Sequence, residues 1–300
     1  MSELTLNRYL HNYFGCKVYK ISLSTGCTCP NRDGKISKGG CTFCSSGGSG
    51  EFGQSAAPVH VQIENAIEKI STKLPKTKKV KFIAYFQSFT NTYETGEIPF
   101  EKLESIFIQA HSDSRIAALS IGTRPDCISP RMLDFLAELS KTKPVWIELG
   151  LQTIHESTAK KINRGYSLDV FETAYSELKK SGLAVIVHTI LWLPGESKEM
   201  MKETANYLAK LNPPLDGIKF QLLQILRGTK MAEDYKKNPW PLPDMDEYCL
   251  FVKELADLMD EATVLHRLTG DGPKSLLIEP LWCANKRAVL NQLKKYFDLD

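Results

Sequence analysis

Long hydrophobic runs are missing from this sequence of 300 residues. No apolar stretch approaches the roughly 18 residues that a membrane-spanning helix needs, and the first residues lack the apolar core of a secretory signal peptide. An excess of one charge sign is missing as well, because 38 Lys and Arg residues are balanced by 35 Asp and Glu residues, for a net charge of +3. We therefore expect a cytoplasmic protein with no membrane partner, and the charge alone does not indicate a nucleic-acid-binding protein.

The sequence also lacks the features of disordered, fibrous and dinucleotide-binding chains. Its hydrophobic fraction of 42% and charged fraction of 24% are ordinary for a globular protein, and 19 Gly and 15 Pro residues are too few for a fibrous one. No internal repeat or low-complexity tract stands out, and no GxGxxG motif opens a helix. The chain is long enough to bury a large core as one α/β unit or as two small domains.

A regular alternation of strand and helix patterns is present as far as residue 223. Val80–Phe86 is β-branched and aromatic, which is typical of a buried strand. Strands are expected at 18–23, 80–86, 117–121, 145–149, 183–191 and 217–223, and helices at 61–73, 100–111, 130–139, 168–181 and 197–211. Strands separated by single helices indicate right-handed parallel crossovers. The pattern predicts an α/β fold, a partial (β/α)6 TIM-like barrel, with a doubly wound sheet as the alternative.

The end of the sequence changes character without a clear shift in composition. A proline-rich segment at 238–243 precedes an expected helix at 246–260, a strand at 262–267 and a final helix at 284–297. We expect residues 1–230 to form the barrel, and residues 231–300 to form a C-terminal α/β extension packed on it.

Four of the eight cysteines lie between residues 27 and 44, in a glycine-rich loop directly after the first expected strand. Loops that follow the strands form the active face of a β/α barrel. The Cys41-x-x-Cys44 spacing lets two thiolates reach one metal centre, with Cys29 or Cys27 as a third ligand. The tract at 47–50 predicts a mobile segment within this cysteine loop, residues 26–52.

Three interpretations of the cysteine loop remain open from the residues alone. Four cysteines could form a structural zinc site, although the Cys27-x-Cys29 spacing is uncommon in a closed site. A thioredoxin-like redox pair would sit at a helix start, without the upstream cysteines and the long loop. The third interpretation is an iron–sulfur site with three cysteines and one iron left open for a ligand.

Several short motifs follow one another along the chain, each at an expected strand end or turn. They are Cys29-Pro30-Asn31-Arg32-Asp33-Gly34, Cys41-Thr42-Phe43-Cys44, Ala84-Tyr85-Phe86-Gln87, Gly122-Thr123-Arg124-Pro125-Asp126, Glu148-Leu149-Gly150-Leu151-Gln152, Asn163-Arg164-Gly165-Tyr166, Leu193-Pro194-Gly195-Glu196 and Gly217-Ile218-Lys219. Together they resemble the radical S-adenosylmethionine (SAM) enzymes, in the branch of the Elongator catalytic subunit. The tail motifs His266-Arg267-Leu268-Thr269 and Leu281-Trp282-Cys283 resemble a bacterial single-domain subgroup linked to tRNA wobble-uridine modification.

The resemblance implies that Cys29, Cys41 and Cys44 hold a [4Fe–4S] cluster whose remaining iron binds SAM. In that family the reduced cluster cleaves SAM to a 5′-deoxyadenosyl radical, which takes a hydrogen atom from the substrate. A reducing electron donor such as flavodoxin or ferredoxin is then a partner. Cys27 departs from the subgroup pattern and is the rival to Cys29 as a ligand.

The resemblance also implies roles for side chains near the strand ends. Phe43 is expected to pack near the adenine, with packing inside the loop as the alternative. Gln87 and Ser88 are expected to contact the methionine moiety of SAM, with ordinary turn residues as the alternative. Arg124 is expected to grip a carboxylate, or to pair with the aspartate two residues on and shape the loop. The expected SAM-binding residues are Phe43, Gln87, Ser88, Thr123, Arg124, Glu148, Gln152 and Arg164.

Three polar residues inside apolar strands need partners. A carboxylate such as Glu148 is costly to bury alone, so we expect it to contact SAM or to pair with Arg124 or Arg164. His188 is expected to face the barrel interior near the reacting atoms as a catalytic residue, with a hydrogen-bonded core histidine as the alternative. Lys219, also a candidate catalytic residue, is expected to meet an anionic substrate group, or to extend its amine to solvent.

The resemblance implies the wobble uridine of tRNA as substrate, with conversion of its 5-carboxymethylaminomethyl group to aminomethyl. Five lysines in Lys73–Lys81, and Arg32, Lys35 and Lys38 in the cysteine loop, can contact phosphates or form an ordinary solvated surface. The alternatives are a radical SAM enzyme that acts on a small molecule or a protein, and a non-catalytic zinc or iron–sulfur module.

Overall fold

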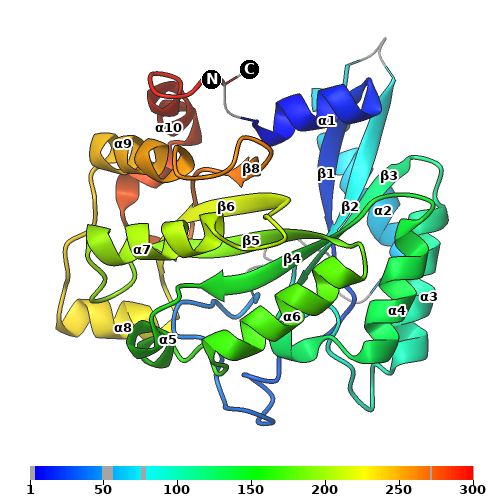
Figure 1. Cartoon of the computed structure of the whole chain (residues 1–300), viewed down its shortest axis with the longest axis horizontal. Coiled ribbons are helices and arrows are strands. Elements are labelled where there is room, and N and C mark those ends of the chain that lie inside the picture. The colour runs from blue at the N-terminus through cyan, green and yellow to red at the C-terminus, as the bar shows by residue number, and fades with distance from the viewer. Residues whose placement is uncertain (1–3, 49–56, 76–78, 271, 300) are drawn as a thin grey trace.

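The computed structural model describes residues 4–48, 57–75, 79–270 and 272–299, and its centre is a curled parallel β-sheet (Figure 1). Its strands are β1 (Lys17–Leu23), β2 (Val80–Phe86), β3 (Ile116–Thr123), β4 (Val145–Gln152), β5 (Ala184–Leu191), β6 (Gly217–Leu222) and β8 (Val264–Arg267). They lie side by side in chain order, and each neighbouring pair is parallel. Because this order never reverses, the sheet is a partial (β/α) barrel, and the doubly wound alternative is wrong.

Helices pack on the outer face of the sheet and connect successive strands (Figure 1). The crossover helices are α2 (Val59–Ile70), α3 (Phe100–Ser112), α4 (Pro130–Ser140), α6 (Leu168–Lys180) and α7 (Lys198–Ala209). The others are α1 (Leu6–Phe14), α5 (Glu156–Lys161), α8 (Lys230–Lys237), α9 (Met245–Ala256) and α10 (Lys286–Leu293). Among the described helices, none combines the length and the apolar character needed to cross a bilayer.

The expected strands and crossover helices are confirmed, with ends that shift by a few residues. Helix α4 begins as expected, because the Oγ atom of Ser129 accepts a hydrogen bond from the backbone N–H of Met132 at 3.2 Å. Helix α6 ends just before Gly182, whose φ of 77° suits glycine. Helices α1, α5 and α8 are absent from the sequence prediction, as is a short antiparallel pair between β7 (Ile225–Leu226) and β9 (Leu277–Glu279).

The expectation of six strands in the sheet needs correction, because a seventh strand, β8, comes from the C-terminal part of the chain. It pairs with β6 along the edge of the sheet. Its own outer edge receives the N-terminal segment, where the N–H of Leu265 donates to the carbonyl of Leu4 at 2.8 Å. Long-range pairing of this kind leaves no local mark in the sequence. The division into residues 1–230 and 231–300 stays a prediction.

A small apolar cluster fills the barrel interior at the amino ends of the strands. It consists of Leu10, Val18, Ile83, Ala118, Trp146 and Ile186. Side chains alternate between the two faces of a strand, so Lys20, Tyr85, Ser120, Glu148 and His188, each two residues further along, point to the same interior. The barrel therefore has an apolar floor made by α1 and the strand starts, and a polar layer above it.

Candidate active site

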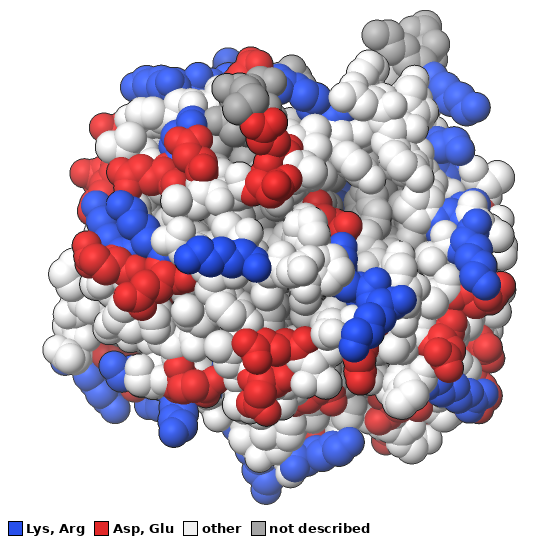
Figure 2. Space-filling model, in the orientation of Figure 1, with Lys and Arg blue, Asp and Glu red and all other residues white. Residues whose placement is uncertain are grey.

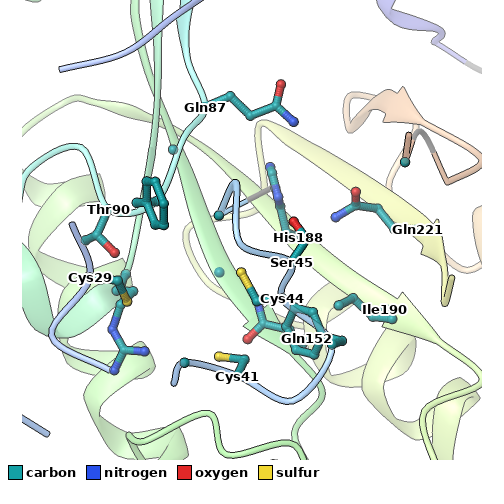
Figure 3. A pocket seen from close by; sticks show the side chains of 18 of the residues that line it. Cys29, Cys41, Cys44, Ser45, Gln87, Thr90, Gln152, His188, Ile190 and Gln221 are labelled. Atoms are coloured by element: carbon teal, nitrogen blue, oxygen red, sulfur yellow. The ribbon is translucent and has the colours of Figure 1, made fainter. Parts of the chain in front are cut away.

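A cavity of about 240 Å³ opens at the carboxyl ends of the strands. The cysteine loop lines one part of it, and the strand ends line the rest, with Gln87 after β2, His188 on β5 and Gln221 on β6 (Figure 3). The carboxyl ends of parallel strands are where barrel enzymes place their chemistry. Of the cysteine loop, residues 49–52 lie outside the described residues, and so does part of the glycine tract at 47–50.

Cys29, Cys41 and Cys44 all line this cavity (Figure 3). A tight turn joins the last two, because the N–H of Cys44 donates to the carbonyl of Cys41 at 3.0 Å. Burial raises the pKa of the Cys41 thiol to about 12, with further contributions from Cys44 and Cys29. Cys41 is therefore close enough to Cys44 and Cys29 to be influenced by them, and a nearby cation would be needed to keep its sulfur as a thiolate.

Cys27 lies apart from these three cysteines. Its side chain is 3% exposed and packs in the main hydrophobic core. The Cys27 thiol donates a hydrogen bond to the backbone carbonyl of Tyr93 at 3.4 Å. This placement favours Cys29 over Cys27 as a ligand and argues against a closed four-cysteine zinc site.

The donor set fits an iron–sulfur cluster better than a single ion. Across the described part of the chain, no three His, Cys, Asp or Glu side chains converge closely enough to hold one metal ion. A [4Fe–4S] cluster takes each thiolate on a different iron, so its ligands surround a volume and do not meet at a point. Three cysteines of one loop that face a shared cavity have that arrangement.

The cysteine loop is held by the segment that follows α5. The Nδ2 atom of Asn31 donates to the carbonyl of Asn163 at 2.5 Å and to Sγ of Cys41 at 3.5 Å. In return, Nδ2 of Asn163 donates to the carbonyl of Gly40 at 2.9 Å. Gly165 has a φ of +81°, and a Cβ there would lie 2.8 Å from Oδ1 of Asn31. Both asparagines and Gly165 thus set the position of the cysteines.

Most of the residues expected to bind SAM line the cavity. They are Phe43, Gln87, Thr123, Arg124, Glu148, Gln152 and Arg164. Ser88 is buried and is not among the described lining residues. Gln152 has a φ of 64°, a strained value for a residue other than glycine, and its Oε1 accepts a hydrogen bond from the Tyr166 hydroxyl at 3.2 Å.

Arg124 adopts the second of its two expected roles. Its Nε and Nη2 atoms donate to the two carboxylate oxygens of Asp126 at 2.8 and 2.7 Å. Its Nη1 atom donates to the carbonyl of Arg164 at 2.8 Å. The guanidinium is thus occupied in shaping the loop that carries Thr123.

Arg164 is fully buried and holds the backbone of the neighbouring loop. Its guanidinium donates to the carbonyls of Tyr166, Leu151 and Thr153 at 2.9, 3.0 and 2.6 Å. The Nη2 atom also pairs with Glu156 at 3.0 Å. The expectation that Arg124 or Arg164 pairs with Glu148 is therefore wrong.

Glu148 is the centre of a buried polar network. Its Oε1 accepts hydrogen bonds from Lys20 at 2.8 Å and from Ser120 at 2.6 Å. Its Oε2 accepts from Lys219 and lies 2.8 Å from Nε2 of His188. Burial opposes ionisation, but Lys20 and Lys219 outweigh it and hold the pKa of Glu148 well below its usual range. The carboxylate is satisfied by protein groups on both oxygens.

Lys219 and His188 differ in their access to the cavity. Lys219 is 1% exposed, pairs with Glu148 and donates to the Tyr85 hydroxyl at 3.1 Å, so the expected extension to solvent is wrong. Lys219 is also not among the described residues that line the cavity. His188 lines the cavity and is hydrogen-bonded to Glu148, and its catalytic role stays a prediction.

Sequence reasoning misses Lys20, Ser120 and Arg267 as members of the site. Lys20 and Ser120 contact Glu148, and Arg267 lines the cavity and lies opposite Lys219 in the register of β6 and β8. The sequence feature that could have identified them is the one that identifies Glu148: each is a polar side chain inside an apolar strand. Which of these residues meet depends on strand register across the whole sheet.

Basic and acidic side chains are interspersed on the hollowed face of the molecule (Figure 2). In the cysteine loop, Arg32 donates to the carbonyls of Cys44 and Ser45, so its guanidinium folds the loop. Residues 76–78 of the lysine-rich segment lie outside the described residues.

Comparisons with known proteins agree with this geometry. Residues 24–208 match the Radical SAM superfamily, and residues 215–298 match the Radical_SAM C-terminal domain. The chain is 41% identical to the uncharacterized protein YtqA of Bacillus subtilis, over 97% of this chain and 88% of that protein. It is 28% identical to a tRNA uridine(34) acetyltransferase of Methanocaldococcus infernus, over 55% of this chain and 30% of that protein.

The same fold occurs in the solved structure of the archaeal Methanocaldococcus infernus Elp3 with an N-terminal deletion. The TM-score is 0.65 and the identity 20%, over 93% of this chain and 62% of the Elp3 chain. At this identity the likeness concerns the fold.

Proposed function

This chain belongs to the radical SAM superfamily, and from that premise we propose that Cys29, Cys41 and Cys44 hold a [4Fe–4S] cluster and that the cavity beside them binds SAM. When bound and reduced, the cluster supplies homolytic cleavage of SAM for hydrogen abstraction from a substrate. The observation that carries the proposal is the placement of these three cysteines on one cavity, with Cys27 buried elsewhere. A one-electron donor such as flavodoxin or ferredoxin is part of the same proposal.

The protein orients the cluster ligands and the SAM-binding side chains. Asn31 donates toward the sulfur of Cys41, a contact that stabilises negative charge on a thiolate. Phe43 supplies an apolar surface for the adenine, and Gln87 and Thr123 offer polar contacts at the strand ends. Arg164 acts through the backbone that it holds.

The proposed substrate is the wobble uridine of tRNA, with shortening of a carboxymethylaminomethyl group at C5 to an aminomethyl group. Support comes from the relative that is named a tRNA uridine(34) acetyltransferase and from the likeness of fold to Elp3. Carbons next to nitrogen in such a chain resist polar chemistry, which suits abstraction of a hydrogen atom.

Anaerobic reconstitution with iron and sulfide tests the chemistry. We expect iron and acid-labile sulfide in equal amounts and reductant-dependent formation of 5′-deoxyadenosine from SAM. Glu138→Gln, a substitution on the exposed surface, should behave like the unmodified protein in the same assay. Stoichiometric zinc without SAM cleavage would contradict the proposal.

Mass spectrometry of tRNA nucleosides from a deletion strain tests the substrate. We expect the carboxymethylaminomethyl nucleoside to accumulate and its aminomethyl product to decrease, with both restored by the unmodified gene. An unchanged uridine profile would remove tRNA as substrate and leave the radical chemistry in place.

A further inference from the structure

The Glu148–His188 pair connects the buried charges of the barrel to the cavity. Nε2 of His188 lies 2.8 Å from Oε2 of Glu148. Both residues line the cavity, but the Glu148 side chain is 0% exposed, whereas that of His188, labelled in Figure 3, is 18% exposed. The Nε2 edge of the imidazole therefore contacts Glu148, and the Nδ1 edge is left for a molecule bound in the cavity.

The hydrogen on this imidazole can be assigned from its partner. Glu148 accepts hydrogen bonds from Lys20, Lys219 and Ser120, which stabilise its ionised form. An ionised carboxylate has no hydrogen to donate. Nε2 of His188 must therefore carry the hydrogen in this contact.

A second proton on His188 is disfavoured by its surroundings. Lys219 on β6, Arg267 on β8 and Lys20 on β1 belong to the same group of side chains, and Glu148 on β4 is the carboxylate of that group among the described residues. Burial, followed by Lys219, lowers the pKa of His188 to about 4. The ring is neutral at pH 7, which leaves Nδ1 without a hydrogen.

Nδ1 then has a lone pair and no donor to fill it. The hydrogen bonds of the described residues include none to this atom. It is also absent from the buried polar atoms of the described chain that lack a partner, so it is accessible. An acceptor with these properties on a cavity wall is suited to an N–H group.

We propose that Glu148 is a positioning residue that fixes His188 in the Nε2-protonated tautomer, so that Nδ1 accepts a hydrogen bond from an N–H group of the substrate. The identity of this group rests on the proposed function, because an aminomethyl chain carries an N–H beside the carbons open to hydrogen abstraction. An acceptor of this kind on a cavity wall discriminates against a substituent that lacks the N–H. His188 thereby selects the substrate and orients it.

Nitrogen NMR of the ¹⁵N-histidine-labelled, reconstituted protein tests the tautomer. We expect His188 to show a pyridine-like Nδ1 and a pyrrole-like Nε2, unchanged between about pH 6 and pH 8. Loss of one signal pair in the spectrum of His188→Asn assigns the resonances. A protonated Nδ1 would overturn the proposal.

Two substitutions at His188 test separately the contact of Nε2 with Glu148 and the contact of Nδ1 with the substrate. His188→Gln keeps an amide donor near the position of Nε2 for Glu148 and removes the acceptor at Nδ1. His188→Asn keeps an amide oxygen near Nδ1 and gives up the contact with Glu148. With tRNA as substrate, we expect KM to rise about tenfold in His188→Gln and less in His188→Asn, from the loss of one hydrogen bond.

His60→Gln is the matched control and should leave KM unchanged. Equal KM values for His188→Gln and the unmodified protein would refute the contact with substrate. The tautomer is measured without tRNA, so a failure of the proposed substrate leaves that result intact and the two failures are distinguishable.

Discussion

Five polar side chains on the inner face of the sheet form one connected group. Lys20, Ser120, Glu148, His188 and Lys219 come from five different strands and meet at a single carboxylate. Each would be costly to bury alone, and together they satisfy both oxygens of Glu148. Loss of one member therefore affects all of the others.

The buried carboxylate predicts a large stability effect. Glu148→Gln leaves the buried Lys219 and the partly buried Lys20 without their anion, and we expect a loss of about 3–5 kcal/mol in the free energy of unfolding. Urea unfolding of both proteins at neutral pH measures this difference. Glu138→Gln, which breaks an exposed pair with Lys141, should cost less than about 1 kcal/mol. Similar values for the two variants would contradict the role of the network.

The same carboxylate predicts a pH dependence. The pKa of Glu148 is held well below its usual range in the folded state, so its contribution to stability is present above the usual pKa of glutamate and declines as pH falls through the folded pKa. The stability difference between the unmodified protein and Glu148→Gln should therefore shrink in acid. Unfolding curves recorded from neutral to acidic pH test this, and a constant difference would speak against it.

Cys41 and Cys27 belong to the same loop and predict different outcomes for cluster binding. Cys41→Ala removes a thiolate from the cavity and should abolish iron binding after reconstitution. Cys27→Ala removes a thiol that packs in the core and should largely spare iron binding, at a small cost in stability. Iron content and visible absorption distinguish the variants. Loss of the cluster in Cys27→Ala but not in Cys29→Ala would reverse the ligand assignment.

At the level of elements, the cysteine loop takes its shape from a distant segment. Residues 162 and 163 contribute backbone oxygens to Thr42 and Asn31, while Gly165 leaves room for the side chain of Asn31. The loop is thus ordered by α5 and its following turn, which come much later in the chain.

This contact predicts a difference between two glycine substitutions. Gly165→Ala and Gly182→Ala both force a side chain into positive φ, at 81° and 77°, and each should lose about 1 kcal/mol of stability. Only at Gly165 would the new Cβ collide with Asn31, since nothing described lies within 4 Å of a Cβ at Gly182. We expect reduced iron content in Gly165→Ala alone. Equal iron content in both variants would show that Asn31 does not position the loop.

Elements with a strong local pattern could be predicted from the sequence, and the others could not. Strand β2 is apolar and β-branched, and α4 has both an N-cap and an initial proline, so the expected bounds are close. Helix α1 is short and its partners lie at the opposite edges of the sheet. The partners of Glu148 could not be predicted either, because they come from other strands and the register between strands is defined only in the folded sheet.

At the scale of the whole molecule, the sheet runs without a break from β1 to β8. Strands β6 and β8 both lie within residues 215–298, which match the Radical_SAM C-terminal domain, and β6 pairs directly with β5 of the preceding region. The main hydrophobic core includes residues on both sides of residue 230, among them Phe220 and Phe251.

A continuous sheet and core predict one cooperative unfolding transition. Far-UV circular dichroism and tryptophan fluorescence should give coincident curves, because Trp146 reports on the barrel and Trp282 on the C-terminal region. Trp282→Phe should leave the midpoint of the fluorescence curve nearly unchanged. Two separated transitions would instead favour residues 231–300 as an independent unit.

Helix α1 covers the end of the barrel opposite the cysteine loop. Leu10 packs in one cluster with Val18, Ile83 and Trp146, so apolar side chains close the barrel at the amino ends of its strands. In the described part of the chain, the cavity opens at the other end of the barrel, on the side of the cysteine loop. If the substrate is the proposed uridine of tRNA, the target nucleotide has to turn out of its strand and enter the cavity base first. The product then has to leave through the same opening by which the base entered.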